Sequence, residues 1–222
     1  MRVLYYHCLS PFARKARVVL KEKGLDFDEI VVRDWERPDE FLALNPAGDV
    51  PVFVDEGERV ICGATPICEY VDEAYPKPGL LGPDPITRAE VRRLVEWFDH
   101  KFFAEVTVNS AGEKLTKRVR GGSAPDSRAI RAGRANVHIH LQYIAWLTER
   151  RTWLAGDTLS LADLTAACHL SLVDYAGDVP WEDHPLAKDW YARVKSRPSF
   201  RPIVNEVIPG IPAPAHYADL DF

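Results

Sequence analysis

The sequence predicts an α/β domain followed by an all-helical domain. Short β-rich runs alternate with helical runs before residue 76, whereas apolar residues beyond residue 85 recur at helical spacing. Between these parts, the stretch PKPGLLGPDP contains four prolines and two glycines, which interrupt regular structure and indicate a linker. We therefore expect a first domain at 1–76, a linker at 77–84, a helical domain at 85–200 and a C-terminal tail at 201–222.

The first domain is expected to have the element order β-α-β-α-β-β-α. Ser10-Pro11 is a typical helix start and Gly24 a typical helix stop. Asp55-Glu56-Gly57 is a turn signal between two apolar runs, which predicts a hairpin. The expected segments are strands at 2–6 and 27–32, helices at 10–24 and 38–44, a hairpin at 52–61, and a helix beginning near Thr65.

In the second domain, two groups of apolar residues follow a helical period. They are Leu94, Val95, Phe98, Phe102 and Val106, and then Ile130, Val137, Leu141 and Ile144. A sharper signal lies in the stretch LSLADL at 159–164. Here Ser160 is expected to cap a helix and Asp163 to reach back to the backbone of Ser160, which makes a capping box.

Composition excludes several classes of function. The net charge of −5 and the pI near 5.8 argue against a nucleic-acid-binding protein. No apolar run reaches the length of a membrane span or a signal peptide, so we expect a cytoplasmic protein without membrane insertion. The four cysteines form no C-x-x-C pair and have no histidines at metal spacing, so no metal site is expected.

Together, this domain order, Val50-Pro51 before the third strand and the stretch WLAGDTLSLAD at 153–163 resemble the cytosolic glutathione S-transferase family. The resemblance covers about residues 1–200. It implies a thioredoxin-like N-terminal domain and a C-terminal helical bundle. It also implies that Pro51 follows a cis peptide bond and that the Val50 backbone pairs with the cysteine of glutathione.

The same resemblance exposes a gap in the expected glutathione pocket. Family members usually carry Glu/Gln-Ser at the start of the helix after the fourth strand, and this chain has Gly63-Ala64 there. Each lost charge-assisted hydrogen bond weakens binding by about 1.5–3 kcal/mol, so affinity is expected to fall by about a hundredfold or more. The backbone N–H of Ala64 or Thr65, together with the Thr65 hydroxyl, remains as a partial substitute.

At the catalytic end, the stretch SPFARKAR from Ser10 resembles the C-P-F-x-x-x-x-R run of thiol-using transferases, with serine in place of cysteine. Thiol exchange is therefore not expected. Ser10 remains a weak candidate for donating to a glutathione thiolate. The alternative is that its hydroxyl only caps the following helix.

A narrower resemblance concerns the tail, the stretches VPWED at 179–183 and SRPSFRPI at 196–203, and RDWE at 33–36. These are similar to glutathione-transferase-like bacterial division proteins that bind the tubulin homologue FtsZ. The resemblance implies a homodimer that binds FtsZ filaments at the division site, without transferase activity and without a cofactor. The alternatives are a glutathione transferase acting on a small electrophile, with glutathione as its cosubstrate, and a ligand-binding protein with a weak pocket.

Two surfaces are candidates for partner binding. A basic surface is expected from the stretch KLTKRVR at 114–120 with Arg128, Arg131 and Arg134, in an otherwise acidic chain, although such charge runs are often only a solvated face. The tail carries aromatic residues between aspartates, and it either docks on its own domain or binds a partner. Deletion of residues 216–222 is expected to abolish or strongly reduce FtsZ binding and to change the melting temperature only slightly. The candidate residues are Trp35, Lys117, Arg118, Arg131, Arg134, Tyr217, Asp219, Asp221 and Phe222.

Overall fold

The computed structural model describes residues 1–220 and separates into two compact units. Unit 1 comprises Met1–Gly79, and unit 2 begins at Leu80. The boundary falls inside the stretch 77–84 that the sequence marks as a linker. Leu80 and Leu81 are both buried, and the Leu80 carbonyl accepts a hydrogen bond from the Leu161 N–H, so this end of the linker belongs to unit 2.

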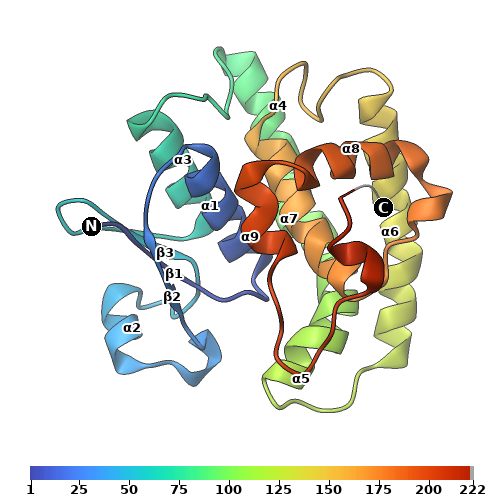
Figure 1. The fold of residues 1–222 in the computed structure, drawn as a ribbon, viewed down its shortest axis with the longest axis horizontal. Coiled ribbons are helices and arrows are strands. Elements are labelled where there is room, and N and C mark those ends of the chain that lie inside the picture. The colour runs from blue at the N-terminus through green and yellow to red at the C-terminus, as the bar shows by residue number, and fades with distance from the viewer. Residues whose placement is uncertain (221–222) are drawn as a thin grey trace. The chain divides into compact units, whose positions relative to one another are not determined.

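Unit 1 has the predicted order of strands and helices (Figure 1). Its elements are β1 (Val3–Tyr6), α1 (Pro11–Glu22), β2 (Asp28–Val31), the short turn η1 (Asp34–Glu36), α2 (Asp39–Leu44), β3 (Val52–Asp55), β4 (Arg59–Cys62) and α3 (Ala64–Ala74). The Ser10 hydroxyl accepts a hydrogen bond from the Ala13 N–H, which explains why α1 begins directly after it. The expected α/β architecture is confirmed.

The sheet of unit 1 has the strand order β2-β1-β3-β4. β1 and β2 run parallel, with Val3 opposite Asp28, whereas β1–β3 and β3–β4 are antiparallel. Helices α1 and α3 pack against each other, and the core includes Val52 and Phe53, both fully buried. Strand β2 therefore lies at an edge of the sheet, with a single neighbouring strand.

Unit 2 is helical, as predicted. Its elements are α4 (Pro85–Glu96), η2 (Trp97–Thr116), α5 (Lys117–Val119), α6 (Ser127–Thr148), α7 (Leu161–Tyr175), η3 (Trp181–Asp183), α8 (Pro185–Lys195), η4 (Pro198–Phe200), α9 (Arg201–Val204) and η5 (Ala215–Tyr217). Helix α7 packs against α4, η2 and α8 (Figure 1). All of its residues are buried. It forms the centre of this unit.

Segment η2 differs from the α-helix that the apolar spacing predicts. It has π-type hydrogen bonding, and at its end the Lys117 N–H donates to the carbonyl of Gly112, five residues earlier. Phe98, Phe102 and Val106 are fully buried as expected. Spacings of four residues fit both a wide and a normal helical turn, so the sequence pattern does not distinguish them.

The capping box at the start of α7 is present and extends further than the sequence indicates. Asp163 Oδ2 accepts hydrogen bonds from the Ser160 N–H (3.0 Å) and hydroxyl (2.9 Å). Its Oδ1 accepts from the Leu154 N–H and from Trp190 Nε1, each at 2.9 Å. The side chain is fully buried, and this burial raises the pKa of Asp163, an effect that the hydrogen bonds oppose. Asp163 thus joins three segments of unit 2.

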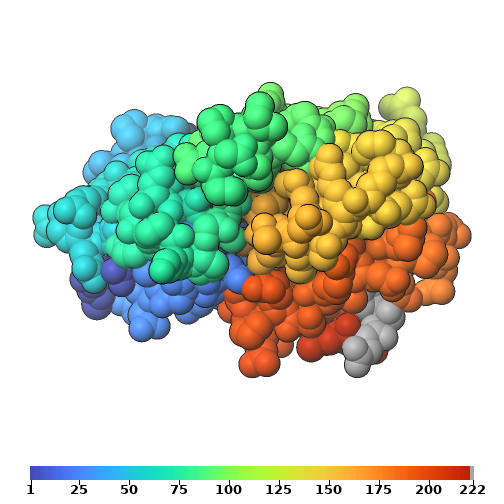
Figure 2. All heavy atoms as spheres, turned by 90° about the horizontal axis from the view of Figure 1, so that it is seen from above, coloured from blue at the N-terminus to red at the C-terminus, as the bar shows by residue number. Residues whose placement is uncertain are grey.

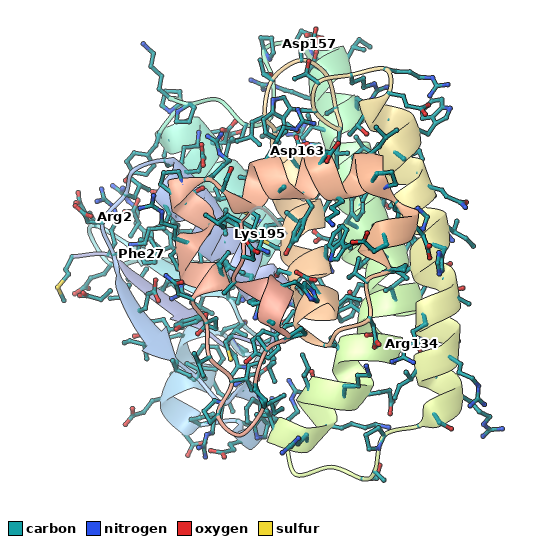
Figure 3. All side chains as sticks on the ribbon, turned by 45° about the vertical axis from the view of Figure 1, so that its right-hand side comes forward. Arg2, Phe27, Arg134, Asp157, Asp163 and Lys195 are labelled. Atoms are coloured by element: carbon teal, nitrogen blue, oxygen red, sulfur yellow. The ribbon has the colours of Figure 1, made fainter. Side chains whose placement is uncertain are left out.

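Figure 3 contrasts this aspartate with a second one on the loop before α7. Asp163 lies inside unit 2 beside α8, whereas Asp157 projects outward from the loop and is exposed. The same loop, residues 150–160, lies at the surface in Figure 2, where it is gold.

The C-terminal segment docks on its own unit. The Tyr217 ring is only 1% exposed and meets the Tyr175 ring edge-on at 4.9 Å, and its hydroxyl donates to the Ile203 carbonyl at 3.0 Å. Lys195 Nζ donates to the carbonyls of His216 and Asp219. Burial lowers the pKa of Lys195, and the nearby charges of Asp174 and Asp219 oppose this effect only in part. Among residues 1–220, no helix is long and apolar enough to span a membrane.

Candidate functional site

In unit 1, the start of α3 meets the turn before β3. The Val50–Pro51 peptide bond is cis, as the resemblance implies, and the Pro51 carbonyl accepts a hydrogen bond from the Gly63 N–H at 3.0 Å. This contact fixes the first turn of α3 beside Val50. Within the described chain, the Val50 N–H and carbonyl make no hydrogen bond of their own. An extended peptide can therefore pair with the Val50 backbone.

The first turn of α3 presents backbone donors and no capping side chain. The first hydrogen bond within the helix runs from the Ile67 N–H to the Gly63 carbonyl, and Pro66 has no N–H. The N–H groups of Ala64 and Thr65 have no acceptor among the described residues. With the positive end of the helix dipole, they can hold one carboxylate, but without the two side chains that the family usually adds.

Gly63 itself adopts a positive φ of 88°, a conformation that other residues rarely adopt. A Cβ there would meet only Pro66, at 3.5 Å, so space is not the obstacle. The cost lies in the backbone, at about 1–2 kcal/mol for a residue with a side chain. Replacing Gly63 with glutamate therefore strains the turn that it is meant to complete.

Ser10 lies at the start of α1, and the cap to Ala13 N–H at 3.2 Å uses one lone pair of its hydroxyl oxygen. Its hydroxyl proton has no acceptor among the described residues, and the side chain is partly exposed. No hydrogen bond joins Ser10 to Val50, Pro51 or Ala64 within the described chain. The structure therefore accounts for Ser10 as a cap and leaves its proton available for donation.

The cysteine next to this pocket is not built as a nucleophile. Cys62 Sγ donates to the Leu44 carbonyl at 3.6 Å, and burial, followed by the charge of Asp49, raises the pKa of its thiol. A raised pKa leaves little thiolate at neutral pH. Neither disulfides nor a cluster of three metal-ligating side chains are found within residues 1–220.

The positive charge of the basic surface of unit 2 is partly neutralised by a buried carboxylate. Asp178 is buried, and its Oδ1 accepts from Lys114 Nζ (2.6 Å) and Arg134 Nε (2.7 Å). Its Oδ2 accepts from the Ser110 hydroxyl at 2.7 Å. Arg134 on α6 is labelled in Figure 3 and remains 54% exposed despite this ion pair. Arg134 therefore has a structural role in addition to any role at the surface.

The remaining basic candidates also differ in whether another residue engages their charge. Lys117 pairs with Glu113 at 2.5 Å, and Arg118 donates to the Gly210 carbonyl at 2.9 Å, which ties α5 to the C-terminal segment. Arg131 is exposed and makes no ion pair with another described residue. Of the four basic candidates, Arg131 alone has a charge that no described residue engages, and it is therefore the best test of the surface.

The aromatic and acidic candidates lie in different surroundings. Trp35, in η1, is half-buried and meets the His7 ring edge-on at 4.8 Å. Tyr217 presents its ring to its own unit, so this side chain anchors the tail internally and is not open to a partner in this conformation. Asp219 is exposed. The other two tail candidates, Asp221 and Phe222, lie outside the described residues.

Asp178, whose carboxylate holds Lys114 and Arg134 of the basic surface, was not predicted from the sequence. It follows Gly177 at the end of α7, and Gly177 has a positive φ of 71° that ends the helix. A carboxylate just after a helix stop is common, and only the folded structure shows which basic residues reach it. The nearest available signal was the excess of basic residues at 114–134 without an equal number of acidic neighbours.

Comparison with known proteins identifies the family. A family model described as "Glutathione S-transferase, N-terminal domain" matches residues 9–74, and one described as "Glutathione S-transferase, C-terminal domain" matches residues 132–198. The chain belongs to the glutathione S-transferase family. Each unit of this transferase-family chain thus matches one of the two family domains, as the resemblance predicts.

Three matches, one to a sequence and two to solved structures, extend over nearly the full length of both chains. FtsZ-localized protein A of Caulobacter vibrioides is 49% identical, over 100% of this chain and 98% of the relative. A crystal structure of a glutathione S-transferase from Rhodospirillum rubrum F11 is 63% identical with a TM-score of 0.99, covering 100% of both chains. The structure of FzlA from C. crescentus is 50% identical with a TM-score of 0.96, covering 100% of this chain and 99% of that one.

Proposed function

We propose that this chain is a non-enzymatic adaptor on a glutathione-transferase scaffold, and that it binds FtsZ filaments and regulates septal constriction in bacterial cell division. The observation that carries the proposal is the full-length similarity, 49% identical, to a relative named FtsZ-localized protein A. In this proposal the protein acts as a cytoplasmic homodimer at the division site and needs no cofactor. The start of α3, where Gly63 and Ala64 offer no capping side chain, supports a scaffold without transferase activity.

A direct test is co-sedimentation of the purified chain with FtsZ polymerised by GTP, beside FtsZ kept in GDP as the unpolymerised control. The proposal expects the chain to pellet with filaments and to remain in solution without them. Pelleting that does not depend on filaments, or none at all, would contradict it.

The basic surface gives a sharper version of this test. Arg131→Glu is expected to weaken filament binding and to flatten its dependence on salt, because an exposed charge contributes to association while adding little stability. Arg150→Glu makes the same change of charge at another exposed position of unit 2 and is the charge control. Arg134→Glu is not a clean probe, because it places a second carboxylate beside the buried Asp178. An equal loss of filament binding in Arg131→Glu and Arg150→Glu would show a nonspecific charge effect.

The second candidate function is glutathione conjugation to a small electrophile. Three features favour it: the unpaired Val50 backbone, the open N–H groups of Ala64 and Thr65, and the free hydroxyl proton of Ser10. The relative from Rhodospirillum rubrum that is named a glutathione S-transferase also favours it. Calorimetry with glutathione separates the two: the adaptor proposal expects binding too weak to measure below about 1 mM, given two missing charge-assisted contacts. Binding in the tens of micromolar, with turnover of a chlorodinitrobenzene-type substrate, would support the transferase instead.

A further inference from the structure

Strand β2 leaves part of its backbone unpaired. Hydrogen bonds to β1 come from alternate residues, as shown by the Asp28 N–H donating to the Arg2 carbonyl at 2.9 Å and the Val32 N–H donating to the Tyr6 carbonyl at 2.8 Å. In a parallel pair the residues between point the other way. The N–H and carbonyl groups of Glu29 and Val31 therefore face away from the sheet, and no described residue pairs with them.

This edge is unusually apolar for one that faces solvent. Ile30 is 42% exposed and Val31 is 62% exposed. Natural sheet edges are commonly protected by charged side chains, by proline or by a covering segment. The Glu29 side chain is turned toward Arg17, with which it pairs at 2.5 Å, and so does not shield the outer backbone groups.

A groove of about 420 Å³ runs beside this edge, between β2 and α2. Its wall includes the side chains of Tyr5 and Phe41, whose ring centroids are 6.1 Å apart. Because Ile30 lies opposite Tyr5 in the strand register, both side chains are on the sheet face that α2 covers. The groove can thus receive apolar side chains from a strand that lies along β2.

The rim of the groove is acidic. Glu36 and Glu40 both line it and are exposed, together with Arg33. Arg33 pairs with Glu36 at 3.2 Å, whereas Glu40 makes no ion pair with a described residue. An occupant that carries a basic side chain next to its apolar ones would therefore complement this rim.

We propose that β2 is a docking edge for an extended peptide segment of a partner protein, one that presents apolar and basic side chains on the same face of its strand and adds to the sheet as a fifth strand. The unpaired groups of Glu29 and Val31 supply the backbone hydrogen bonds, the Tyr5–Phe41 groove takes the apolar side chains, and Glu40 takes the basic ones. This mode of recognition gains its affinity from the main chain and its selectivity from alternate side chains. It is independent of the proposed binding to FtsZ filaments.

The probe is a fluorescein-labelled heptapeptide, Lys-Thr-Val-Thr-Lys-Thr-Val, whose lysines and valines lie on one face of an extended strand, measured by fluorescence anisotropy on the full chain. A contact of this size is expected to give a Kd on the order of 10–100 µM. The same peptide with N-methylated central amides keeps its charge and side chains but cannot form the strand, and it should bind at least about tenfold more weakly. Equal binding of the two peptides would overturn the proposal and show only attraction between a basic peptide and an acidic protein.

Two variants of the chain locate the contact. Val31→Pro removes an outward-facing N–H at an edge, where proline is tolerated, and should weaken the unmodified peptide about tenfold with little change in melting temperature. Glu40→Lys should weaken it severalfold, whereas Glu73→Lys, at an exposed position on α3, is the matched charge control. If Val31→Pro lowers the melting temperature strongly, the methylated peptide and the comparison of Glu40→Lys with Glu73→Lys still decide the question. Equal effects of Glu40→Lys and Glu73→Lys would overturn the assigned position.

Discussion

Two regions of the molecule, the carboxylates of Asp163 and Asp178 in unit 2 and the exposed backbone of α3 and β2 in unit 1, treat their polar groups in opposite ways. In unit 2, Asp163 and Asp178 are buried, and both oxygens of each carboxylate accept hydrogen bonds from neighbouring segments. In unit 1, the start of α3 and the outer edge of β2 leave backbone donors without acceptors among the described residues. Buried polar groups that are satisfied hold a fold together, whereas exposed ones that are not satisfied are available for binding. The two buried carboxylates therefore stabilise the fold of unit 2, whereas the exposed backbone groups of unit 1 are available to a ligand or a peptide.

The largest expected effect is at Asp163. Asp163→Ala should lower the free energy of unfolding by about 3 kcal/mol or more, because the buried N–H groups of Leu154, Ser160 and Trp190 would all lose their acceptor. This exceeds the value of about 1 kcal/mol for an isolated capping contact. Urea unfolding measures it, with Asp157→Ala as the exposed control, expected to change stability by less than about 0.5 kcal/mol. Similar values for the two aspartates would remove the basis of the comparison.

Next in size is Tyr217. Tyr217→Ala should destabilise unit 2 by about 3 kcal/mol, because it removes a buried ring and the hydrogen bond to the Ile203 carbonyl. The sequence led us to expect that removing the end of the tail would change the melting temperature only slightly, and the burial of Tyr217 reverses that expectation. Leu220→Ala, at a residue 39% exposed, is the control and should cost below about 1 kcal/mol. A small shift for Tyr217→Ala would indicate that the tail is undocked in solution.

The start of α3 gives a prediction of intermediate size for unit 1. Ala64→Ser restores a hydroxyl beside the open N–H groups and should strengthen glutathione binding about tenfold, if one charge-assisted hydrogen bond is regained. Gly63→Glu should instead cost about 1–2 kcal/mol of stability, because of the positive φ at this position. Calorimetry and thermal unfolding of both single variants separate these effects. Unchanged affinity in Ala64→Ser would mean that the pocket fails for another reason than its missing side chains.

The smallest expected effect concerns an ion pair of unit 2 and its dependence on pH. Hydrogen bonds from Arg93, and further from Arg151, lower the pKa of Glu90 to about 2. A folded pKa below the unfolded one adds stability above the unfolded pKa, and this is lost as pH falls toward the folded value. Glu90→Gln should therefore cost about 1 kcal/mol at pH 7 and almost nothing near pH 2. Denaturant titrations at several pH values test this, and a difference that does not change with pH would contradict it.

The sequence predicts local elements well where one short signal decides them. Ser10 before Pro11 sets the start of α1, and Ser160 with Asp163 sets the start of α7, because caps act within a single turn. The cis bond before Pro51 followed only from the resemblance to a family. The bonds from Asp163 to Leu154 and Trp190 were not predictable, since they join residues that only the packed fold brings together.

The candidate site shows the same limit. The missing side chains at Gly63 and Ala64 can be read from the sequence, whereas the positive φ of Gly63 and the free N–H groups next to it cannot. Among the basic residues, the sequence gives no means to separate Arg131 from Arg134. The difference between them is a contact across 44 positions, from Arg134 to Asp178.

The neutralisation at Asp178 has a consequence for the speed of association. Two of the positive charges on this face, those of Lys114 and Arg134, are offset by one buried carboxylate, so the field that reaches into solution is weaker than the residue count implies. At physiological salt such a field already decays over about 8 Å. Attraction from a distance is therefore weaker than the residue count implies, and the rate at which this face associates with an acidic partner is expected to lie near the unsteered range of about 10⁵–10⁶ M⁻¹s⁻¹. Its selectivity then depends on how long a complex lasts once formed, rather than on how often the partners meet.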